Sequence, residues 1–339
     1  MADRVRVAVD AMGGDNAPLE IVKGAVLALN ESKELEIVLA GVQDRIEDAL
    51  KEAGSWDKER LSILDAPEII DMAEPPVNAV RTKKDSSIVK AMKLVGSGEC
   101  DAYVSAGSTG ANLVGGQFIV GRLKGVKRAP LAPLIPTEKG VSLLIDCGAN
   151  VDARADHLVQ FAKMGAVYME HIRGVKNPTV GLVNIGAEEE KGNALVKETF
   201  PLLTQLKEEG KLNFIGSVEA RDIPAGAADV VVCEAFTGNV ILKMYEGVAK
   251  SLLHVVKKGM LSSVRSKIGA LLVKPALKEA LAEYDLSSYG GAPMLGLTGL
   301  IVKTHGSATA VEVKNSILQC IPYVKEDVTG HIRKALDLE

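Results

Sequence analysis

The strongest constraint on the fold is a unit that recurs along the chain: a short apolar run, a turn and an amphipathic stretch. The apolar runs predict strands at residues 5–10, 35–41, 61–66, 102–107, 141–148, 179–186, 212–216 and 229–235. Their near-continuous apolar character is typical of strands buried on both faces. The amphipathic stretches predict helices at residues 18–29, 86–95, 112–122, 156–171, 193–206 and 239–257. This alternation predicts a three-layer α/β/α fold.

Glycine occurs in most of the turns that lead from a predicted strand to a predicted helix. These turns are AMGGDNAP (11–18), SAGSTGA (105–111), DCGANVD (146–152), NIGAEEEKGN (184–193) and EAFTGN (234–239). Ligands of open α/β sheets bind beyond the carboxyl ends of the strands, where glycine lets backbone N–H groups approach an anion. Helix N-termini also favour negative charge. The set of turns therefore predicts a phosphate-binding active site.

The common nucleotide-binding loops are missing from these turns. Neither G-x-G-x-x-G nor G-x-x-x-x-G-K-[ST] occurs in the chain, so NAD or ATP bound in those modes is not predicted. The formal net charge is −4 and aromatic residues make up 4% of the chain. Neither a strong basic field nor base-stacking platforms are therefore expected, and no nucleic-acid partner is predicted.

The length of 339 residues suits a single catalytic α/β unit over residues 1–339, with two interleaved subdomains as the alternative. The cysteines are widely spaced and are expected to be small core residues in a reducing compartment. The N-terminus has no apolar signal core, and no apolar run approaches the ~20 residues of a membrane span. We therefore expect a cytoplasmic protein. No histidines stand four residues apart, so no zinc site is predicted.

Residues 257–284 have a different pattern. Their apolar residues at helical spacing predict a helical hairpin, in which Pro275 starts the second helix and residues 269–273 form an apolar turn. Cations flank this turn at Arg265, Lys267, Lys274 and Lys278. Two functions remain open: a dimer-interface or core-packing hairpin, or a contact with an anionic membrane or acidic partner through Leu271, Leu272 and Val273.

Taken together, the turns and their flanking residues closely resemble one family, the bacterial phosphate acyltransferases. The resemblance covers nearly the whole chain, and residues 30–75 and the hairpin match more loosely. It is carried by VAVDAMGGDNAP (7–18), VSAGSTGA (104–111), FIVGRLKG (118–125), LLIDCGANVDA (143–153), HLVQFAKMG (157–165), GLVNIGAEEEKGN (181–193), NFIGSVEARD (213–222), FTGNVILK (236–243), SSYGGAPMLGL (287–297) and VKTHGSA (302–308).

The resemblance implies an activity and a fold. The reaction would convert an acyl-carrier-protein thioester and inorganic phosphate to acyl phosphate and free carrier protein, for phospholipid synthesis. The fold would be a mixed, mainly parallel α/β/α arrangement like that of isocitrate and isopropylmalate dehydrogenases and phosphotransacetylase. The resemblance also implies a homodimer with peripheral membrane association through the hairpin, and no metal or organic cofactor.

The resemblance points to Lys191 and Asn239 as the principal catalytic residues. Lys191 would meet the charge of phosphate or of the developing oxyanion, and Asn239 would donate a hydrogen bond to the same group. The structural alternatives are that Lys191 pairs with the acidic residues 188–190 and that Asn239 caps a helix. Phosphate is itself a nucleophile, so the enzyme must hold it at roughly 3–3.5 Å from the thioester carbon.

Other residues of the turns are candidates for binding phosphate or substrate. They are Asp10, Gly13, Gly14, Asn16, Gly107, Ser108, Thr109, Gly110, Asn150, Gly238 and His305. Asp15 or Asn16 is expected to cap the helix that follows the first turn, and Pro18 suits the first turn of that helix. Ser108 is not expected to be a nucleophile, because SAGSTG lacks the first glycine of a G-x-S-x-G elbow.

The densest cluster of basic residues comprises Arg122, Lys124, Lys127 and Arg128. Carrier proteins are acidic, so this cluster is a candidate docking patch, with an ordinary solvated loop as the alternative. Two further functions compete with the main one. They are a phosphotransacetylase that uses coenzyme A thioesters and a non-catalytic phosphate- or lipid-sensing membrane scaffold. A nicotinamide dehydrogenase is less favoured, because its nucleotide and metal-carboxylate signatures are not apparent.

Overall fold

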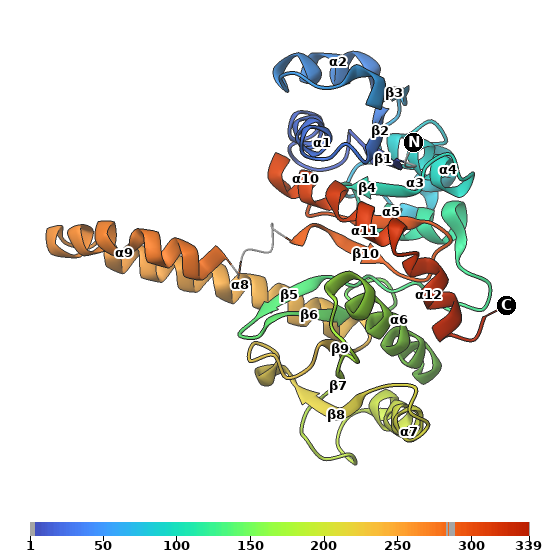
Figure 1. The fold of residues 1–339 in the computed structure, drawn as a ribbon, viewed down its shortest axis with the longest axis vertical. Coiled ribbons are helices and arrows are strands. Elements are labelled where there is room, and N and C mark those ends of the chain that lie inside the picture. Colours follow the sequence, from blue (N-terminus) through green and yellow to red (C-terminus); the bar gives the residue numbers. More distant parts are fainter. Residues whose placement is uncertain (1–3, 283, 285–288, 339) are drawn as a thin grey trace.

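The structure is a computed structural model that describes residues 4–282, 284 and 289–338. Residue 283 of the predicted hairpin and residues 287–288 of the SSYGGAPMLGL segment lie outside the described residues. The strands form two mainly parallel sheets (Figure 1). The first sheet contains, in spatial order, β10 (Ala292–Met294), β11 (Leu300–Lys303), β4 (Ala102–Ser105), β1 (Val5–Asp10), β2 (Leu35–Gly41) and β3 (Leu61–Asp65).

The second sheet contains β5 (Leu134–Thr137), β6 (Gly140–Ile145), β9 (Val230–Val232), β7 (Val180–Asn184) and β8 (Phe214–Glu219). In each sheet only the first strand in this order, β10 or β5, pairs antiparallel with its neighbour. The chain completes β1 to β4 in the first sheet, builds the second sheet, and returns to the first with β10 and β11. An antiparallel bridge between Leu131, which precedes β5, and Met294, the last residue of β10, connects the two sheets.

Helices cover both faces of the sheets, as the alternation of apolar runs predicts. They are α1 (Leu19–Glu31), α2 (Gln43–Glu52), α3 (Pro76–Thr82), α4 (Ser87–Gly96), α5 (Thr109–Gly115), α6 (Ala155–Arg173), α7 (Ala194–Glu208), α8 (Ala235–Met260), α9 (Val264–Ala282), α10 (Ala310–Leu318), α11 (Cys320–Lys325) and α12 (Val328–Ala335). Shorter helical turns are η1 (Lys58–Arg60), η2 (Gly116–Gly121), which is a π-helix, and η3 (Ala220–Asp222).

Strand β1 shows why the first sheet is buried on both faces. Val7 and Val9 belong to one apolar cluster with residues of α1 and α10, whereas Ala8 belongs to a second cluster with residues of α4. Successive side chains of a strand point to opposite faces, so both faces of β1 need apolar residues. The cluster around Val7 also includes Leu143 of β6, so one apolar core extends across both sheets.

Several element boundaries differ from those predicted. The strand expected at 212–216 is β8 at Phe214–Glu219, and the strand expected at 229–235 ends at Val232. The helix expected at 112–122 is divided into α5 and the π-helical turn η2. The short strands β5, β10 and β11 were not predicted, because each has only three or four residues.

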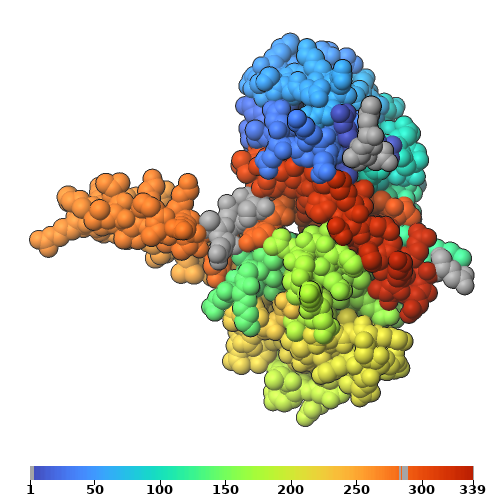
Figure 2. All heavy atoms as spheres, in the orientation of Figure 1, coloured from blue at the N-terminus to red at the C-terminus, as the bar shows by residue number. Residues whose placement is uncertain are grey.

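The hairpin lies elsewhere in the sequence than predicted. It is formed by α8 and α9, which project together from the rest of the molecule (Figures 1 and 2). Its turn is at residues 261–263 rather than 269–273, and α9 continues through Pro275. The physical reason is a serine cap: Ser263 Oγ accepts a hydrogen bond from Ser266 N at 3.1 Å, so the second helix starts there.

Candidate functional site

The carboxyl ends of β1, β4 and β11 bring polar residues together at one edge of the first sheet. Asp10 is fully buried at the end of β1, and Ser105 Oγ donates a hydrogen bond to its Oδ2 at 2.7 Å. Gly107 N donates to Ser105 Oγ at 2.9 Å, and Met12 N donates to Asp10 Oδ1 at 3.2 Å. Burial raises the pKa of Asp10, against the effect of these hydrogen bonds.

Glycine is required where the turns after β1 and β4 meet. A Cβ atom on Gly13 would lie 2.2 Å from Asp10 Oδ2 and 2.6 Å from Gly107 N. Gly14 has a φ of +97°, and a Cβ atom there would lie 2.7 Å from Gly306 O in the turn after β11. The predicted residues Gly13 and Gly107 therefore lie against the buried carboxyl group of Asp10, which was also predicted. Gly14, the fourth predicted residue here, lies against the turn after β11.

Other predicted residues of the first-sheet edge connect and cap its turns. Asn16 Nδ2 donates to Ser307 O at 3.1 Å and to Ala308 O at 3.2 Å, so Asn16 ties the turn after β1 to that after β11. Neither Asp15 nor Asn16 caps α1: the residue before that helix is Pro18, and no side chain caps it. The predicted cap is therefore wrong, because the Asn16 amide is directed to the neighbouring turn instead.

The residues predicted around α5 and the last turn have local contacts. Ser108 Oγ accepts from Ala111 N at 3.4 Å and caps α5, and Thr109, which begins that helix, is exposed. A Cβ atom on Gly110 would lie 2.9 Å from Pro76 Cγ, so this glycine allows α3 and α5 to pack closely. His305 is exposed, and its Nδ1 lies 2.8 Å from Ser307 Oγ.

The second sheet has its own buried carboxyl group at the corresponding edge. Asp146 follows β6, and its Oδ1 accepts from Leu131 N at 3.0 Å. Its Oδ2 accepts from Asn150 N at 2.8 Å and from Asn150 Nδ2 at 2.7 Å. Burial raises the pKa of Asp146 to about 6. The Asn150 amide also donates to Ala129 O at 3.0 Å, so the buried side chain of Asn150 stabilises this turn.

Asn239 lies at this second edge because α8 packs on the Asp146 turn. A Cβ atom on Gly238 would lie only 1.9 Å from Asp146 O. Asn239 is the next residue, and it is exposed. Its side chain lies near Gly148 in the Asp146 turn, since a Cβ atom added to Gly148 would be 3.9 Å from Asn239 Oδ1. The cap of α8 is Glu234, whose side chain accepts from Phe236 N and Thr237 N. The alternative that Asn239 caps a helix is therefore wrong.

Lys191 lies in the turn between β7 and α7, with its side chain over Gly186. Its Nζ lies 2.7 Å from a carboxyl oxygen of Glu188. The ion pair that was the structural alternative for Lys191 is therefore present. Both side chains are about half exposed, and such a pair contributes about 0–1 kcal/mol. An incoming anion can therefore replace Glu188 at small cost.

The start of α8 lies at the edge of the second sheet, where Gly238 packs on Asp146. Strands β6, β9 and β7 are parallel neighbours, so the turns carrying Asp146, Asn239 and Lys191 follow the same edge of the second sheet. Figure 1 shows α8 passing β5 and β6 and projecting away from the two sheets. Burial and, to a smaller extent, Lys243 of α8 lower the pKa of Lys303 at the first-sheet edge to about 8, so the two ammonium groups are within electrostatic range. The candidate site therefore lies where the two edges face α8.

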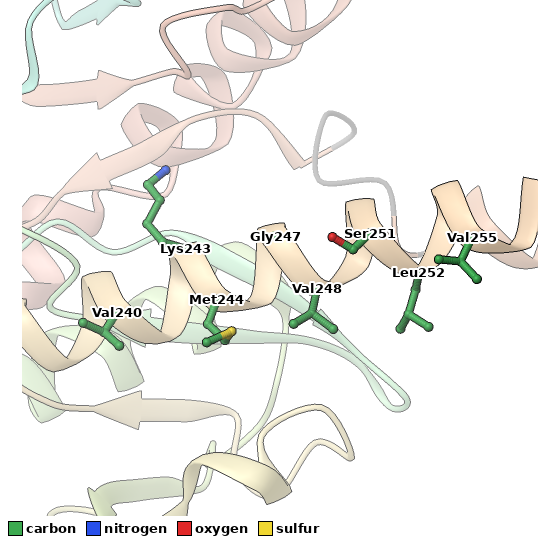
Figure 3. Close-up of a pocket in the computed structure, with 8 residues that line it drawn as sticks. All are labelled: Val240, Lys243, Met244, Gly247, Val248, Ser251, Leu252 and Val255. Atoms are coloured by element: carbon green, nitrogen blue, oxygen red, sulfur yellow. The ribbon is translucent and has the colours of Figure 1, made fainter. Parts of the chain in front are cut away.

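Residues that sequence reasoning missed include Asp146, Lys303 and Lys243. Asp146 and Lys303 share a usable signal: each is a charged residue at the carboxyl end of an apolar run, in VSLLID and LIVK. A charge in that position is rarely buried without a specific partner or role. Lys243 has no such signal. Only the structure shows that its side chain points away from the apolar row of α8 (Figure 3).

The four predicted basic residues, Arg122, Lys124, Lys127 and Arg128, are all exposed after η2. Lys127 Nζ lies 2.5 Å from Asp156 Oδ2, and the Arg122 guanidinium donates to Lys127 O. Asp156 therefore offsets part of the local positive charge.

An apolar row on α8 is uncovered. Val240, Met244, Val248, Leu252 and Val255 line a groove of about 720 Å³ together with Lys243, Gly247 and Ser251 (Figure 3). Every lining residue comes from α8, so this groove is one uncovered helix face rather than an enclosed pocket. Leu271 and Leu272 of α9 are 73% and 77% exposed, and Val273 is 48% exposed. No helix within the described residues is long and apolar enough to cross a membrane.

Burial makes the cysteines unsuitable as nucleophiles, as expected of core residues. All four are free and buried. Burial raises the pKa of Cys147 and of Cys233, which lie near the second-sheet edge, well above the usual range of a thiol. In the part of the chain that the structure describes, no three His, Cys, Asp or Glu side chains are grouped to hold a metal ion.

Comparison with known proteins places this chain in a family. A family model described as "Fatty acid synthesis protein" matches residues 5–331. A putative phosphate acyltransferase of Clostridium perfringens is 49% identical over 332 residues, which cover 98% of this chain and 97% of the relative. The chain belongs to the phosphate acyltransferase family. A further phosphate acyltransferase, from Clostridium novyi, is 46% identical over 333 residues, with 98% of this chain and 99% of the relative covered.

Solved structures confirm the predicted phosphotransacetylase-like fold. A phosphotransacetylase from Streptococcus pyogenes superposes with a TM-score of 0.62 at 17% identity, covering 95% of this chain and 94% of that chain. The EutD phosphotransacetylase from Staphylococcus aureus gives a TM-score of 0.60 at 17% identity, with the same shares covered. At this identity the likeness shows the fold alone.

Proposed function

We propose that the chain transfers an acyl group from an acyl-carrier-protein thioester to inorganic phosphate, for membrane phospholipid synthesis. A phosphate oxygen attacks the thioester carbon, the C–S bond breaks, and the products are acyl phosphate and free carrier protein. The proton lost by the attacking phosphate ends on the carrier thiol. Membership of the phosphate acyltransferase family over residues 5–331 carries this proposal.

The geometry suits direct attack by phosphate. The reaction needs cations for phosphate and hydrogen-bond donors for the oxyanion that forms on the acyl carbon. Lys191 and the Asn239 amide are exposed at the second-sheet edge, where both can reach a substrate. The buried cysteines and the cap at Ser108 supply no activated nucleophile, so the proposal contains no covalent acyl-enzyme.

The test is incubation with long-chain acyl carrier protein and phosphate, followed by trapping of acyl phosphate with hydroxylamine. The expected result is a hydroxamate that requires both substrates. Activity only with short-chain coenzyme A thioesters would select the phosphotransacetylase alternative. Binding of phosphate or lipid without turnover would select the scaffold alternative.

The uncovered row of α8 supports a homodimer in which a second copy covers Val240, Met244 and Val248. Met244 is 64% exposed, and a continuous row of apolar side chains on a projecting helix is typical of an interface. Met244→Glu is expected to shift the protein to monomer in sedimentation experiments. Lys250→Glu, on the opposite face of the same helix, is the control. A dimer that persists in Met244→Glu would contradict this interface.

The α9 helix supports peripheral contact with an anionic membrane, which would place this cytoplasmic enzyme at the inner face of the cell membrane. Leu271 and Leu272 are exposed among lysine and arginine residues of the same helix. Apolar side chains flanked by cations bind anionic lipid surfaces. Leu271→Glu or Leu272→Glu is expected to abolish sedimentation with anionic vesicles and to spare activity in solution. Unchanged sedimentation of both variants would argue against this contact.

A further inference from the structure

Three large apolar side chains are exposed beyond the carboxyl ends of neighbouring strands in the second sheet. They are Val151 after β6, Ile185 after β7 and Phe236 after β9, and they are 61%, 80% and 64% exposed. Strand β9 lies between β6 and β7 and is parallel to both, so the three residues follow the same sheet edge. We call them the apolar rim. One exposed apolar residue is ordinary, whereas a group at one edge is typical of a binding surface.

Val151 and Phe236 belong to segments that are joined by a backbone hydrogen bond. Ala235 N donates to Asn150 O at 3.2 Å, and Val151 and Phe236 are the next residues of the two segments. Phe236 N also donates to Glu234 Oε2 at 2.6 Å, which fixes its backbone at the start of α8. The segments that carry these two exposed side chains are therefore held beside each other.

Ile185 is connected to Lys191 through one buried amide group. That amide belongs to Asn184, the last residue of β7, which is 6% exposed. Its Oδ1 accepts from Ile185 N at 2.8 Å, and its Nδ2 donates to Lys191 O at 3.2 Å and to Ser217 Oγ at 3.1 Å. The Asn184 side chain therefore fixes an exposed apolar residue and an exposed cation in one arrangement.

The apolar rim is interleaved with the polar groups of the candidate site. Ile185 shares its turn with Lys191, and Phe236 and Asn239 are three residues apart on α8, so their side chains lie on the same side of that helix. A long-chain thioester has the same two parts, a polar reacting carbonyl group joined to an apolar tail. Because hydrogen bonds already fix the backbone of the rim, little ordering is needed when a chain covers it.

The rim also continues the apolar row of α8 toward the site, since Phe236 precedes Val240 by about one helical turn. A second copy that covers this row accounts for Val240 and the residues beyond it. It does not account for Ile185, which lies in the turn of a neighbouring strand beside Lys191. Continuity with the candidate catalytic residues therefore favours the substrate as the occupant of the rim.

We propose that the apolar rim binds the part of the acyl chain next to the thioester and so determines a preference for long chains. This inference rests on the proposed function. With the carbonyl group at Lys191 and Asn239, the adjoining methylene groups contact Phe236 and Ile185. Each methylene group that the rim removes from water is expected to raise kcat/KM about two- to fourfold. The rim residues determine specificity and take no part in bond breaking.

The first experiment compares kcat/KM for acetyl- and myristoyl-carrier protein, with acyl phosphate trapped as hydroxamate. Wild type is expected to favour the myristoyl substrate. Phe236→Ala and Ile185→Ala are each expected to lower the myristoyl-to-acetyl ratio roughly 3- to 10-fold, and the double variant further. The rate with the acetyl substrate should fall less, because an acetyl group has no methylene to contact the rim.

The chain offers a matched control for each variant. Phe118→Ala removes another exposed phenylalanine, which is in η2 and is 80% exposed. Ile215→Ala removes an isoleucine that is 43% exposed near the amino end of β8, away from the site edge. Both controls should keep the wild-type ratio. Sedimentation of every variant reports whether the oligomeric state has changed.

The second experiment needs no turnover and decides the matter if no thioester reacts. Titration calorimetry at several temperatures compares octyl phosphate with ethyl phosphate, whose alkyl groups represent the acyl chain. Wild type is expected to bind octyl phosphate at least about 10-fold more tightly, with a more negative heat-capacity change, which marks apolar burial. The Phe236→Ala, Ile185→Ala double variant should lose both differences.

Three outcomes of the rate comparison would overturn the proposal. The first is an unchanged myristoyl-to-acetyl ratio in the double variant. The second is an equal loss of activity with both substrates, which would show damage to the reacting groups. The third is a monomeric Phe236→Ala protein that keeps the chain preference, which would assign Phe236 to a second copy. If no thioester reacts, equal binding of the two alkyl phosphates would overturn the proposal, whereas a preference for octyl phosphate that the double variant loses would contradict only the proposed function.

Discussion

Both sheet edges of the candidate site carry a buried carboxyl group, but the lysine residues at the two edges differ in exposure. At the first edge, three polar residues are buried: Asp10, Ser105 and Lys303. Ser105 donates a hydrogen bond to Asp10, and Lys303 donates one to Ala106 O in the turn after β4. At the second edge, Lys191 and Asn239 are exposed. Buried groups are fixed before substrate arrives, whereas exposed ones are free to contact a large substrate. We therefore propose that the exposed groups of the second edge contact the large substrate.

The largest effect is expected at the exposed edge. Lys191→Ala and Asn239→Ala should each reduce kcat by about 100- to 1,000-fold, because each removes a group that stabilises developing charge. Their thermal unfolding should be unchanged, since both side chains are exposed. Steady-state formation of acyl phosphate, with melting curves as the control for folding, measures this effect. Near-normal turnover in both variants would place the chemistry elsewhere.

The next effect concerns the stability of the buried edge. An unfolded lysine has a pKa near 10.5, whereas that of Lys303 in the folded protein is about 8. The unfolded state therefore binds more protons between these values, and folding stability rises with pH across them. Over this pH range, the free energy of unfolding of wild type should increase by roughly 3 kcal/mol relative to that of Lys303→Met. Denaturant unfolding at several pH values measures the difference, and parallel curves would show that Lys303 is not desolvated.

A glycine pair on α8 tests how this helix is fixed at the second edge. Gly238→Ala places a Cβ 1.9 Å from Asp146 O, whereas nothing lies within 4 Å of a Cβ at Gly247. Gly238→Ala should therefore destabilise the protein by about 1–3 kcal/mol and reduce activity. Gly247→Ala should stabilise the exposed helix by up to about 1 kcal/mol. Similar melting temperatures for the two variants would contradict the close packing on Asp146.

The sequence predicted the strand-to-helix turns better than it predicted the hairpin, for physical reasons. Strand-to-helix turns are local, so glycines such as Gly13 and Gly107 could be found from the sequence. Their shared position followed from the rule that ligands bind at the carboxyl ends of strands. The position of the α8–α9 turn involves the cap at Ser263, and the second helix continues through Pro275 instead of starting there.

The smallest effect is expected outside both edges, at the basic residues after η2. Reversal of Lys124 and Arg128 to glutamate should raise the KM for the acidic carrier protein several-fold at low salt and little at high salt. Asp156 already offsets Lys127, so the effect of the patch is limited. An unchanged KM at low salt would assign carrier docking to another surface.

The central claim is that phosphate, held between the two edges, is the nucleophile that attacks the acyl carbon. The most direct measurement is a reaction with fully ¹⁸O-labelled phosphate and unlabelled acyl carrier protein, followed by mass spectrometry of the acyl phosphate. The account predicts that all four phosphate oxygens, including the one that bridges carbon and phosphorus, carry the label. A product with an unlabelled bridging oxygen, or release of fatty acid without acyl phosphate, would contradict it.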